Sequence, residues 1–245
     1  MTFHKLFLLA IILCFRPFSP DVTTTAPGEK AGRKALFGDA VVRVENGTKA
    51  LYEDLGLEEV ISFPAFEEAV RGYLTIQDRK EEILTLIDFS KPSNSKRLAV
   101  VDMKHGRVLY TSVVSHGQGS GGLYATKFSN RDGSHQSSLG FYLTGGTYNG
   151  SNGYSLKLIG LEKGFNDNAL SRAIVMHGAD YCSESVVGSS TRLGRSWGCP
   201  AVPRSLSRPI INAIKGGSVL FIYAKNSDYL AHSPILTQAG RDRYL

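Results

Sequence analysis

The sequence predicts a mainly β protein with a small helical region near its N-terminus. Short runs of apolar and β-branched residues recur over the later part of the 245-residue chain. Turns rich in Gly, Ser and Asn separate these runs, which is typical of strands joined by loops. Before them, apolar residues recur at the spacing of a helix. A chain of this length is sufficient for one sizeable domain with an N-terminal appendage.

The first 20 residues are predicted to be a signal peptide or membrane anchor. Their apolar run, residues 6–13, follows a basic start and has the length of a signal-peptide core rather than of a transmembrane helix. Cys14 follows this run as in a lipoprotein box, but Leu13 stands where a small residue is expected. We therefore expect export to the periplasm or cell envelope. Cleavage, retention as an anchor that associates with the membrane, and lipidation stay open.

Residues 21–47 are rich in Thr, Pro, Gly and Lys and are predicted to be a linker. Residues 48–85 are predicted to form a helical hairpin that packs on the domain after it. Ser62 is placed to cap the second helix, and Pro64 is tolerated in the first turn of a helix.

The β domain is predicted to occupy residues 86–226. Residues 97–102 and 108–114 flank Lys104-His105-Gly106, which is a compact hairpin signal. Further strands are expected at residues 140–143, 156–158, 173–177 and 218–223. Long loops are expected at residues 129–134 and 147–153. A helix is expected over residues 204–215, and a C-terminal tail over 227–245.

The segment with the clearest chemistry is residues 194–201, which read Gly-Arg-Ser-Trp-Gly-Cys-Pro-Ala. A thiol attacks a carbonyl as its thiolate, so a nucleophilic Cys199 needs a neighbouring base or positive field. His177, upstream in the chain, is the candidate base. Gly198 allows a sharp turn, which leaves the backbone N–H groups of Trp197 and Gly198 to face a developing oxyanion.

This pattern resembles the catalytic signature of the YkuD-type L,D-transpeptidases of peptidoglycan, in which His-Gly precedes a Ser/Thr-His-Gly-Cys box. It matches their divergent murein branch, for which Gly-Arg-Ser-x-Gly-Cys-Pro-Ala is the expected form. Trp197 stands where the family usually has His, and Ala201 stands where it usually has a polar residue or Arg. The resemblance runs from about residue 86 to residue 223 and includes the glycine-rich segment 115–121.

The resemblance implies a β-sandwich-like L,D-transpeptidase catalytic domain over residues 86–226. It also implies that Cys199 is the nucleophile and His177 the general base, and that the substrate is a stem tetrapeptide of peptidoglycan. The acyl group would pass to an amine, which makes a 3,3-type cross-link or attaches a protein, or to water, which would make the protein an L,D-carboxypeptidase. It implies no cofactor and no metal.

The tetrapeptide donor is anionic, so the site is expected to present a guanidinium, which meets a carboxylate with two hydrogen bonds. Arg195 is the first candidate and Arg192 the second. The alternative for Arg195 is that it braces the loop through backbone carbonyls. Ser196 is also expected to contact substrate. His116, in the glycine-rich segment, is a candidate for substrate contact, and the alternative is that it stabilises the loop.

Composition argues against several other classes of function. The formal net charge of +6 is compatible with anionic wall polymers, yet no basic stripe interleaved with aromatic residues indicates nucleic-acid binding. No paired Cys-x-x-Cys or His-x-x-x-His spacing supports a metal site. Cys182 and Cys199 are predicted to be free thiols, because a disulfide would quench the nucleophile.

Two alternatives remain beside the transpeptidase reading. Papain-like and NlpC-type peptidases place the cysteine before the histidine, which is the opposite of the order here. Sortases share the order His before Cys, and Arg204 or Arg208 could serve as their late arginine, but their Thr-Leu-x-Thr-Cys strand is missing. A non-catalytic cell-envelope binding protein is the other alternative, and it would not need a reactive Cys199.

Overall fold

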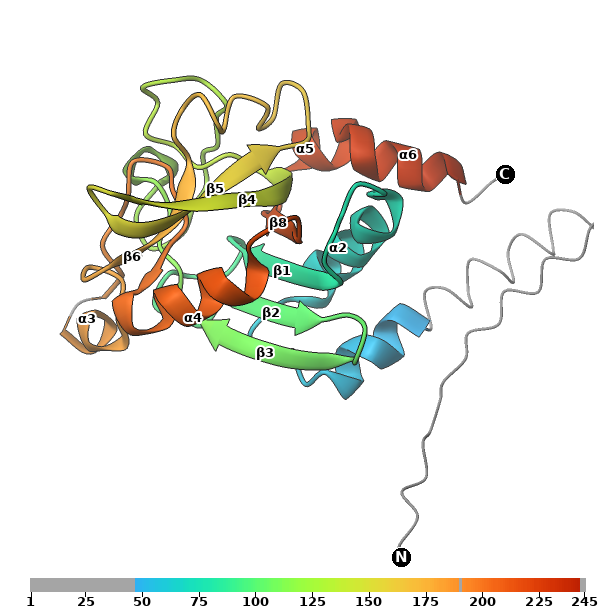
Figure 1. The fold of residues 1–245 in the computed structure, drawn as a ribbon, viewed down its shortest axis with the longest axis horizontal. Coiled ribbons are helices and arrows are strands. Elements are labelled where there is room, and N and C mark those ends of the chain that lie inside the picture. The colour runs from blue at the N-terminus through green and yellow to red at the C-terminus, as the bar shows by residue number, and fades with distance from the viewer. Residues whose placement is uncertain (1–46, 190, 243–245) are drawn as a thin grey trace, which may run out of the picture.

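The computed structural model describes residues 47–189 and 191–242, and its centre is one eight-stranded sheet (Figure 1). The predicted signal segment and all but the last residue of the predicted linker lie outside the described residues. The strand order is β3-β2-β1-β8-β4-β5-β6-β7. The strands are β1 (Ile83–Asp88), β2 (Leu98–Asp102), β3 (Arg107–Ser112), β4 (Gly140–Gly150), β5 (Gly153–Gly160), β6 (Val175–Ala179), β7 (Ala201–Pro203) and β8 (Val219–Tyr223).

The predicted mainly β architecture is confirmed, and the predicted first hairpin is the β2–β3 pair. β1 and β8 run parallel to each other in the middle of the sheet. All residues of β8 and all but the first of β1 are buried. Burial on both faces explains why these two segments are nearly continuous apolar runs rather than alternating ones.

The two edges of the sheet approach each other through the chain that follows β3. Ser115 forms an isolated antiparallel bridge with Ala201 of β7, and its N–H donates to the Ala201 carbonyl over 2.8 Å. Two residues on, Gly117 bridges to Ser196. The curved sheet therefore nearly closes on itself, and the closing seam joins the glycine-rich segment to the cysteine motif.

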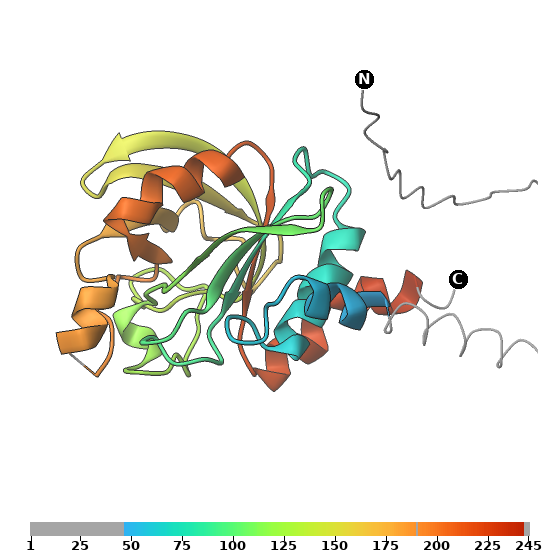
Figure 2. The ribbon, with the colours of Figure 1, turned by 90° about the horizontal axis from the view of Figure 1, so that it is seen from below.

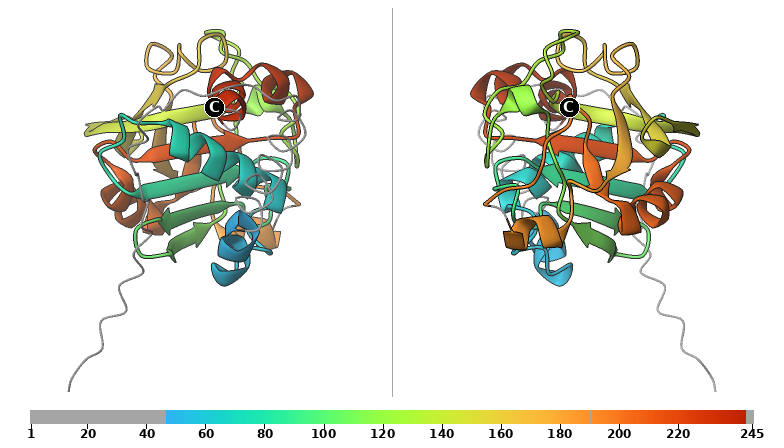
Figure 3. Two further views of the ribbon diagram at one scale, coloured as in Figure 1. Left: turned by 90° about the vertical axis from the view of Figure 1, so that its right-hand side faces the viewer. Right: turned by 90° about the vertical axis from the view of Figure 1, so that its left-hand side faces the viewer.

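Helices cover the sheet on two sides (Figures 2 and 3). α4 (Arg204–Ile214) packs on β5, β6 and β7, while α2 (Phe63–Thr75) packs on β1 and β8. Residues 47–54 form a further helical segment before α2. The short elements are η1 (Gln118–Ser120) and α3 (Glu184–Ser189), and the chain ends in α5 (Ser227–His232) and α6 (Pro234–Asp242).

The prediction that the Ser62 side chain caps α2 is wrong. Ser62 occupies the N-cap position, but its side chain makes no cap hydrogen bond. Its hydroxyl and its N–H instead donate to the Asp88 carboxylate, over 2.7 Å and 2.9 Å. Asp88 ends β1, so the contact fastens the start of α2 to the sheet.

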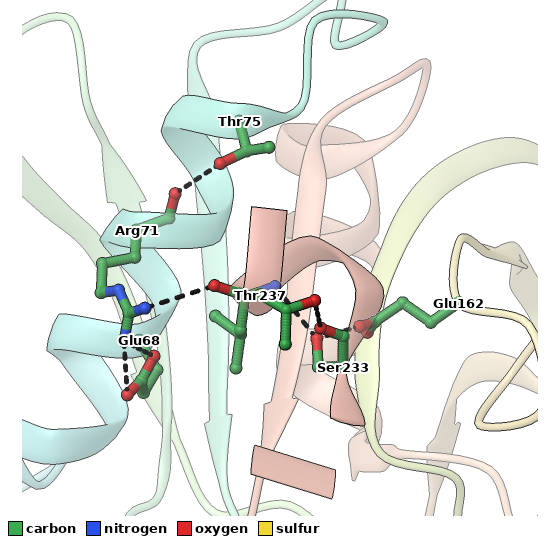
Figure 4. Close-up of polar contacts among 7 residues, drawn as sticks. Glu68, Arg71, Thr75, Glu162, Ser233 and Thr237 are labelled. Atoms are coloured by element: carbon green, nitrogen blue, oxygen red, sulfur yellow. Dashed lines mark hydrogen bonds and ion pairs between the residues drawn. The ribbon is translucent and has the colours of Figure 1, made fainter. Parts of the chain in front are cut away.

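The C-terminal residues 227–242 are helical and held to the domain by a buried carboxylate. Glu162 accepts hydrogen bonds from the Ser233 hydroxyl, the Tyr229 hydroxyl at 2.9 Å and the Phe141 N–H at 2.7 Å. On the other side of α6, Arg71 of α2 donates to the Leu236 carbonyl (Figure 4). Because a buried carboxylate is stable only when it is well hydrogen-bonded, these contacts fix α5 and α6 in place.

Several elements differ from the sequence expectation. β1 begins at Ile83, inside the predicted helical hairpin of residues 48–85, and the described part of the predicted C-terminal tail forms α5 and α6. The predicted loop at residues 147–153 is mostly strand, because β4 continues to Gly150 and turns through Ser151 and Asn152 into β5. The strand expected from residue 173 begins at Val175 instead, because Ala173 has a φ of +53°, outside the β region. No helix of the described residues is long and apolar enough to cross a membrane.

Candidate active site

A cavity of about 420 Å³ opens where the cysteine motif meets the end of β6. It brings together Cys199 and His177, as the motif predicts, with Arg195, Ser196 and Trp197 of the same motif. The lining residues are Ser151, Asn152, Arg172, Ala173, Ile174, His177, Tyr181, Arg195, Ser196, Trp197 and Cys199.

Cys199 lies two residues before β7 and is half-buried. Its Sγ accepts from the Val175 N–H at 3.5 Å and lies 3.7 Å from the Ala173 carbonyl oxygen. Burial raises the pKa of the thiol, while the Val175 N–H and the Arg172 charge act in the opposite direction. The Val175 N–H and the Arg172 charge therefore offset part of the rise in thiol pKa that burial causes.

His177 lies on β6, which pairs in parallel with β7. Its Nδ1 is 3.1 Å from the Gly178 carbonyl oxygen, which can only accept. Nδ1 therefore carries the proton, and the lone pair of Nε2 is left to act as a base. Burial, and then the charge of Arg204, lower the pKa of His177 below 6.5, so the imidazole is neutral at pH 7. The described residues show no hydrogen bond between His177 and Cys199.

The turn before Cys199 requires glycine. Gly198 has a φ of +127°, and a Cβ there would lie 2.9 Å from the Gln136 carbonyl oxygen. Its N–H donates to the Ser196 hydroxyl at 3.1 Å, and that hydroxyl donates to the Cys199 carbonyl at 2.6 Å. The Gly198 N–H, expected to face an oxyanion, is thus used inside the turn. The N–H groups of Trp197 and Cys199 have no partner elsewhere in the described part of the chain.

The position of Arg195 is compatible with both roles considered for it, which are bracing the loop through backbone carbonyls and binding a substrate carboxylate. Its Nη1 donates to the Gly121 carbonyl at 2.9 Å and approaches the Gln118 carbonyl at 3.4 Å, which braces the glycine-rich segment. No described residue takes the hydrogens of Nε and Nη2, and the side chain lines the cavity. One edge of the guanidinium therefore anchors the loop and the other is available to an anion. Arg192 does not line the cavity, and its Nη1 donates to the Leu193 carbonyl.

The structure does not bring His116 to the cavity. The side chain is fully buried, and Nδ1 lies 2.9 Å from Nη2 of the buried Arg97. Arginine only donates, so His116 accepts at Nδ1 and its Nε2–H points to the Gly121 carbonyl at 3.4 Å. Burial, and next the Arg97 charge, lower the pKa of His116 to about 4. In this arrangement His116 supports the loop from beneath and has no surface with which to contact a substrate.

Sequence reasoning missed Arg172, whose charge reaches Cys199. Its Nη1 donates to the Ser129 carbonyl and the Ser138 hydroxyl, and its Nη2 to the Gln136 carbonyl and the Ser134 hydroxyl. These contacts order the loop over residues 129–138. Ser137 of that loop donates to the Gly198 carbonyl at 2.9 Å. Arg172 therefore supports the cysteine turn as well as its charge balance.

The remaining candidates lie away from the cavity. Arg204 pairs with Asp180 at 2.6 Å, and Arg208 lies over the Tyr154 ring. Neither lines the cavity. Cys182 is a free buried thiol, so the prediction of two free thiols is confirmed for the two described cysteines. Within residues 47–189 and 191–242, no three His, Cys, Asp or Glu side chains gather as metal ligands.

Comparison with solved structures gives distant likenesses. An L,D-transpeptidase from Mycobacterium smegmatis is 14% identical, with a TM-score of 0.36 over 58% of this chain and 59% of that one. One from Stackebrandtia nassauensis is 12% identical, with a TM-score of 0.35 over 74% and 77%. The helical cell shape determining protein Pgp2 of Campylobacter jejuni is 12% identical, with a TM-score of 0.39 over 64% and 54%.

The chain spans about three-fifths of the length of the first of these structures. A search of curated proteins finds no match. The family model described as the L,D-transpeptidase catalytic domain matches residues 57–223, which includes the sheet, the cavity and the cysteine motif. The chain therefore belongs to the L,D-transpeptidase catalytic domain family.

Proposed function

We propose that this protein is an exported peptidoglycan L,D-transpeptidase with Cys199 as nucleophile and His177 as general base. The observation that carries the proposal is the meeting of both side chains in one cavity with Arg195, one edge of whose guanidinium has no described protein partner. The stem tetrapeptide carries carboxylates, and a guanidinium edge suits them. The predicted signal segment supports a location in the periplasm or cell envelope.

In the first half-reaction, Nε2 of His177 takes the Cys199 proton as Sγ attacks the carbonyl between the third residue of the stem and its terminal D-amino acid. The Trp197 and Cys199 N–H groups stabilise the oxyanion, an effect of about 3 kcal/mol per donor. The C–N bond then breaks, and His177 protonates the departing amine. A thioester on Cys199 and a free D-amino acid result.

In the second half-reaction, an amine acceptor attacks the thioester and gives its proton to His177. The C–S bond breaks, and the thiolate recovers the proton from the imidazolium. The net change is the exchange of one amide bond for another, with no change of oxidation state. Ser196, which ties its turn together by two hydrogen bonds, keeps the oxyanion donors oriented through both steps.

Muropeptide profiling tests this function. Cell-wall digests treated with the full chain and analysed by mass spectrometry should gain 3,3-type cross-linked species and release the terminal D-amino acid. A profile that gains only tripeptides would identify water as the acceptor, and hence an L,D-carboxypeptidase. An unchanged profile, together with an unlabelled Cys199, would favour the non-catalytic binding protein.

A further inference from the structure

Trp197 stands out at the cavity as a large aromatic side chain that is 72% exposed. It is the single tryptophan of the chain, and it lines the same cavity as Cys199. A single exposed apolar side chain is ordinary on a protein surface and carries no meaning by itself. Here, however, the ring is held in a defined place beside the nucleophile.

The indole stacks on the imidazole of His135, with ring centroids 5.0 Å apart and an interplanar angle of 8°. His135 has a φ of +52°, a conformation that persists only where neighbours enforce it. Its Nδ1 lies 3.0 Å from the Gln118 side-chain nitrogen, and its carbonyl accepts the Gly119 N–H at 2.9 Å. The stack therefore fixes the indole and covers one of its faces, while the exposure of the ring leaves the other face open.

The charges around the cavity make this open face distinctive. The described lining residues include Arg172 and Arg195 but no aspartate or glutamate. Such a lining suits the carboxylates of a donor peptide. It offers no counter-charge to an amine acceptor, which arrives from solution as an ammonium ion. An aromatic face attracts a cation through its quadrupole, and tryptophan does so most strongly.

We propose that the open indole face of Trp197, stacked on His135, receives the ammonium group of the acceptor before it attacks the thioester. The proposal rests on the proposed function, and it names a primary ammonium on an aliphatic chain as the group recognised. Neutral His177 takes one proton from the ammonium and releases it to solvent. The freed amine then attacks the thioester carbonyl, and its second proton passes through His177 to the departing Cys199 thiolate. Trp197 thereby favours transfer to an amine over hydrolysis.

Because the chain has one tryptophan, fluorinated tryptophan supplied during expression changes this ring alone. Fluorine withdraws π density while almost preserving the shape of the ring. In a series from unsubstituted to mono-, di- and trifluorotryptophan, the KM for an amine acceptor should rise stepwise, about 2- to 5-fold in total, as expected for an exposed cation–π contact. A KM that stays flat along the series would overturn the proposal.

Substitution gives a second readout. Trp197→Leu should lower the ratio of transpeptidation to hydrolysis by about 3- to 10-fold, with acylation by the donor as internal reference. Tyr124→Leu is the matched control, because Tyr124 is an aromatic residue 48% exposed that lines a different cavity, and it should leave the ratio unchanged. If Asn152→Ala lowered the ratio of transpeptidation to hydrolysis and Trp197→Leu did not, the acceptor would bind at the β4–β5 turn instead.

The experiments distinguish a failure of the proposed function from a failure of the proposed acceptor site at Trp197. If the unaltered protein forms no acyl-enzyme with a tetrapeptide donor, the proposed function is wrong. If the acyl-enzyme forms and reacts with amines, but the changes at Trp197 move neither KM nor the partition ratio, only the acceptor site is wrong.

Discussion

The two described cysteines lie at the same end of the sheet but in opposite kinds of surroundings. Cys182 is 0% exposed and packs in an apolar cluster with Val113, Ala179, Leu193 and Ala201. Its Sγ is 3.1 Å from the Ala201 carbonyl oxygen, and burial raises its pKa to about 11. Cys199, two residues before Ala201, faces a cavity and has the Val175 N–H against its sulfur.

The comparison teaches that proximity to the site does not make a thiol a nucleophile. At both cysteines burial raises the thiol pKa, and hydrogen-bond donors and an arginine charge act in the opposite direction: Ser115 and Arg97 at Cys182, Val175 and Arg172 at Cys199. The two thiols differ in access, because Cys199 lines a cavity that also contains the His177 imidazole, whereas Cys182 is fully buried and does not line that cavity. Substitutions at the site test this contrast between the two thiols.

Cys199→Ala should reduce transpeptidation by at least about 10⁴-fold, because it removes the nucleophile. Cys182→Ala should retain most of the activity and lower the free energy of unfolding by about 1–2 kcal/mol, because it shortens a buried side chain. Initial rates and denaturant unfolding of both variants measure this. Equal loss of activity from both would assign a shared role to the two thiols.

His177→Gln should lower the acylation rate by about 10²- to 10⁴-fold, as removal of a general base does. The release of the terminal D-amino acid in a single turnover measures this rate. If acylation stayed undiminished in this variant, another residue would have to take the Cys199 proton.

The pH profile separates the base from the thiol. In the unaltered protein, acylation should persist into mildly acidic pH, since burial lowers the pKa of His177 and favours the neutral imidazole. In His177→Gln, the residual acylation should increase only as the pH rises toward the thiol's own pKa, which burial raises. Identical profiles for both proteins would contradict the assignment.

Arg172→Met should raise the apparent pKa of the Cys199 thiol by about 0.5–1 unit, because it removes the positive charge. Iodoacetamide alkylation as a function of pH measures this. Arg172→Lys keeps the charge but loses most of the contacts to residues 129–138, so it should restore the pKa without restoring thermal stability. A thiol pKa that moves equally in both variants would mean that Arg172 acts only by ordering the loop.

Arg195→Lys should raise the KM for the tetrapeptide about 3- to 10-fold, since lysine cannot offer a planar edge of two donors. Arg192→Lys is the matched control and should leave KM unchanged. If Arg195→Lys instead lowers thermal stability and alkylation of Cys199 together, its contact with Gly121 is its main role.

Much of the fold was predictable because its signals are local. The β2–β3 hairpin, β8 and α4 each follow from apolar runs and turn residues close in sequence. The extension of β4 to Gly150 was not predictable in this way. The Gly and Asn residues there suggest a loop, and only their pairing with β5 places them in a strand. Ser62 likewise looks like a cap, but a sheet carboxylate distant in sequence competes for its hydroxyl.

The site residues also differ in how well the sequence predicts them. Cys199 and His177 are recognisable because a short motif carries them, and their roles stay predictions until tested. Arg172 was missed because its importance depends on the loop over residues 129–138 folding around it. His116 was a candidate for substrate contact or for stabilising the loop, and only the closing seam of the sheet, which buries it against Arg97, decides for the loop. Contacts between segments remote in sequence decide both cases.

The most direct test of the central claim is to locate the acyl group on the protein. The full chain is incubated with a stem tetrapeptide donor and no amine acceptor, quenched in acid, and mapped by peptide mass spectrometry. We expect a tripeptide acyl adduct on the peptide that contains Cys199, present in Cys182→Ala and missing in Cys199→Ala. An adduct on Cys182, or no adduct while the terminal D-amino acid is released, would contradict it.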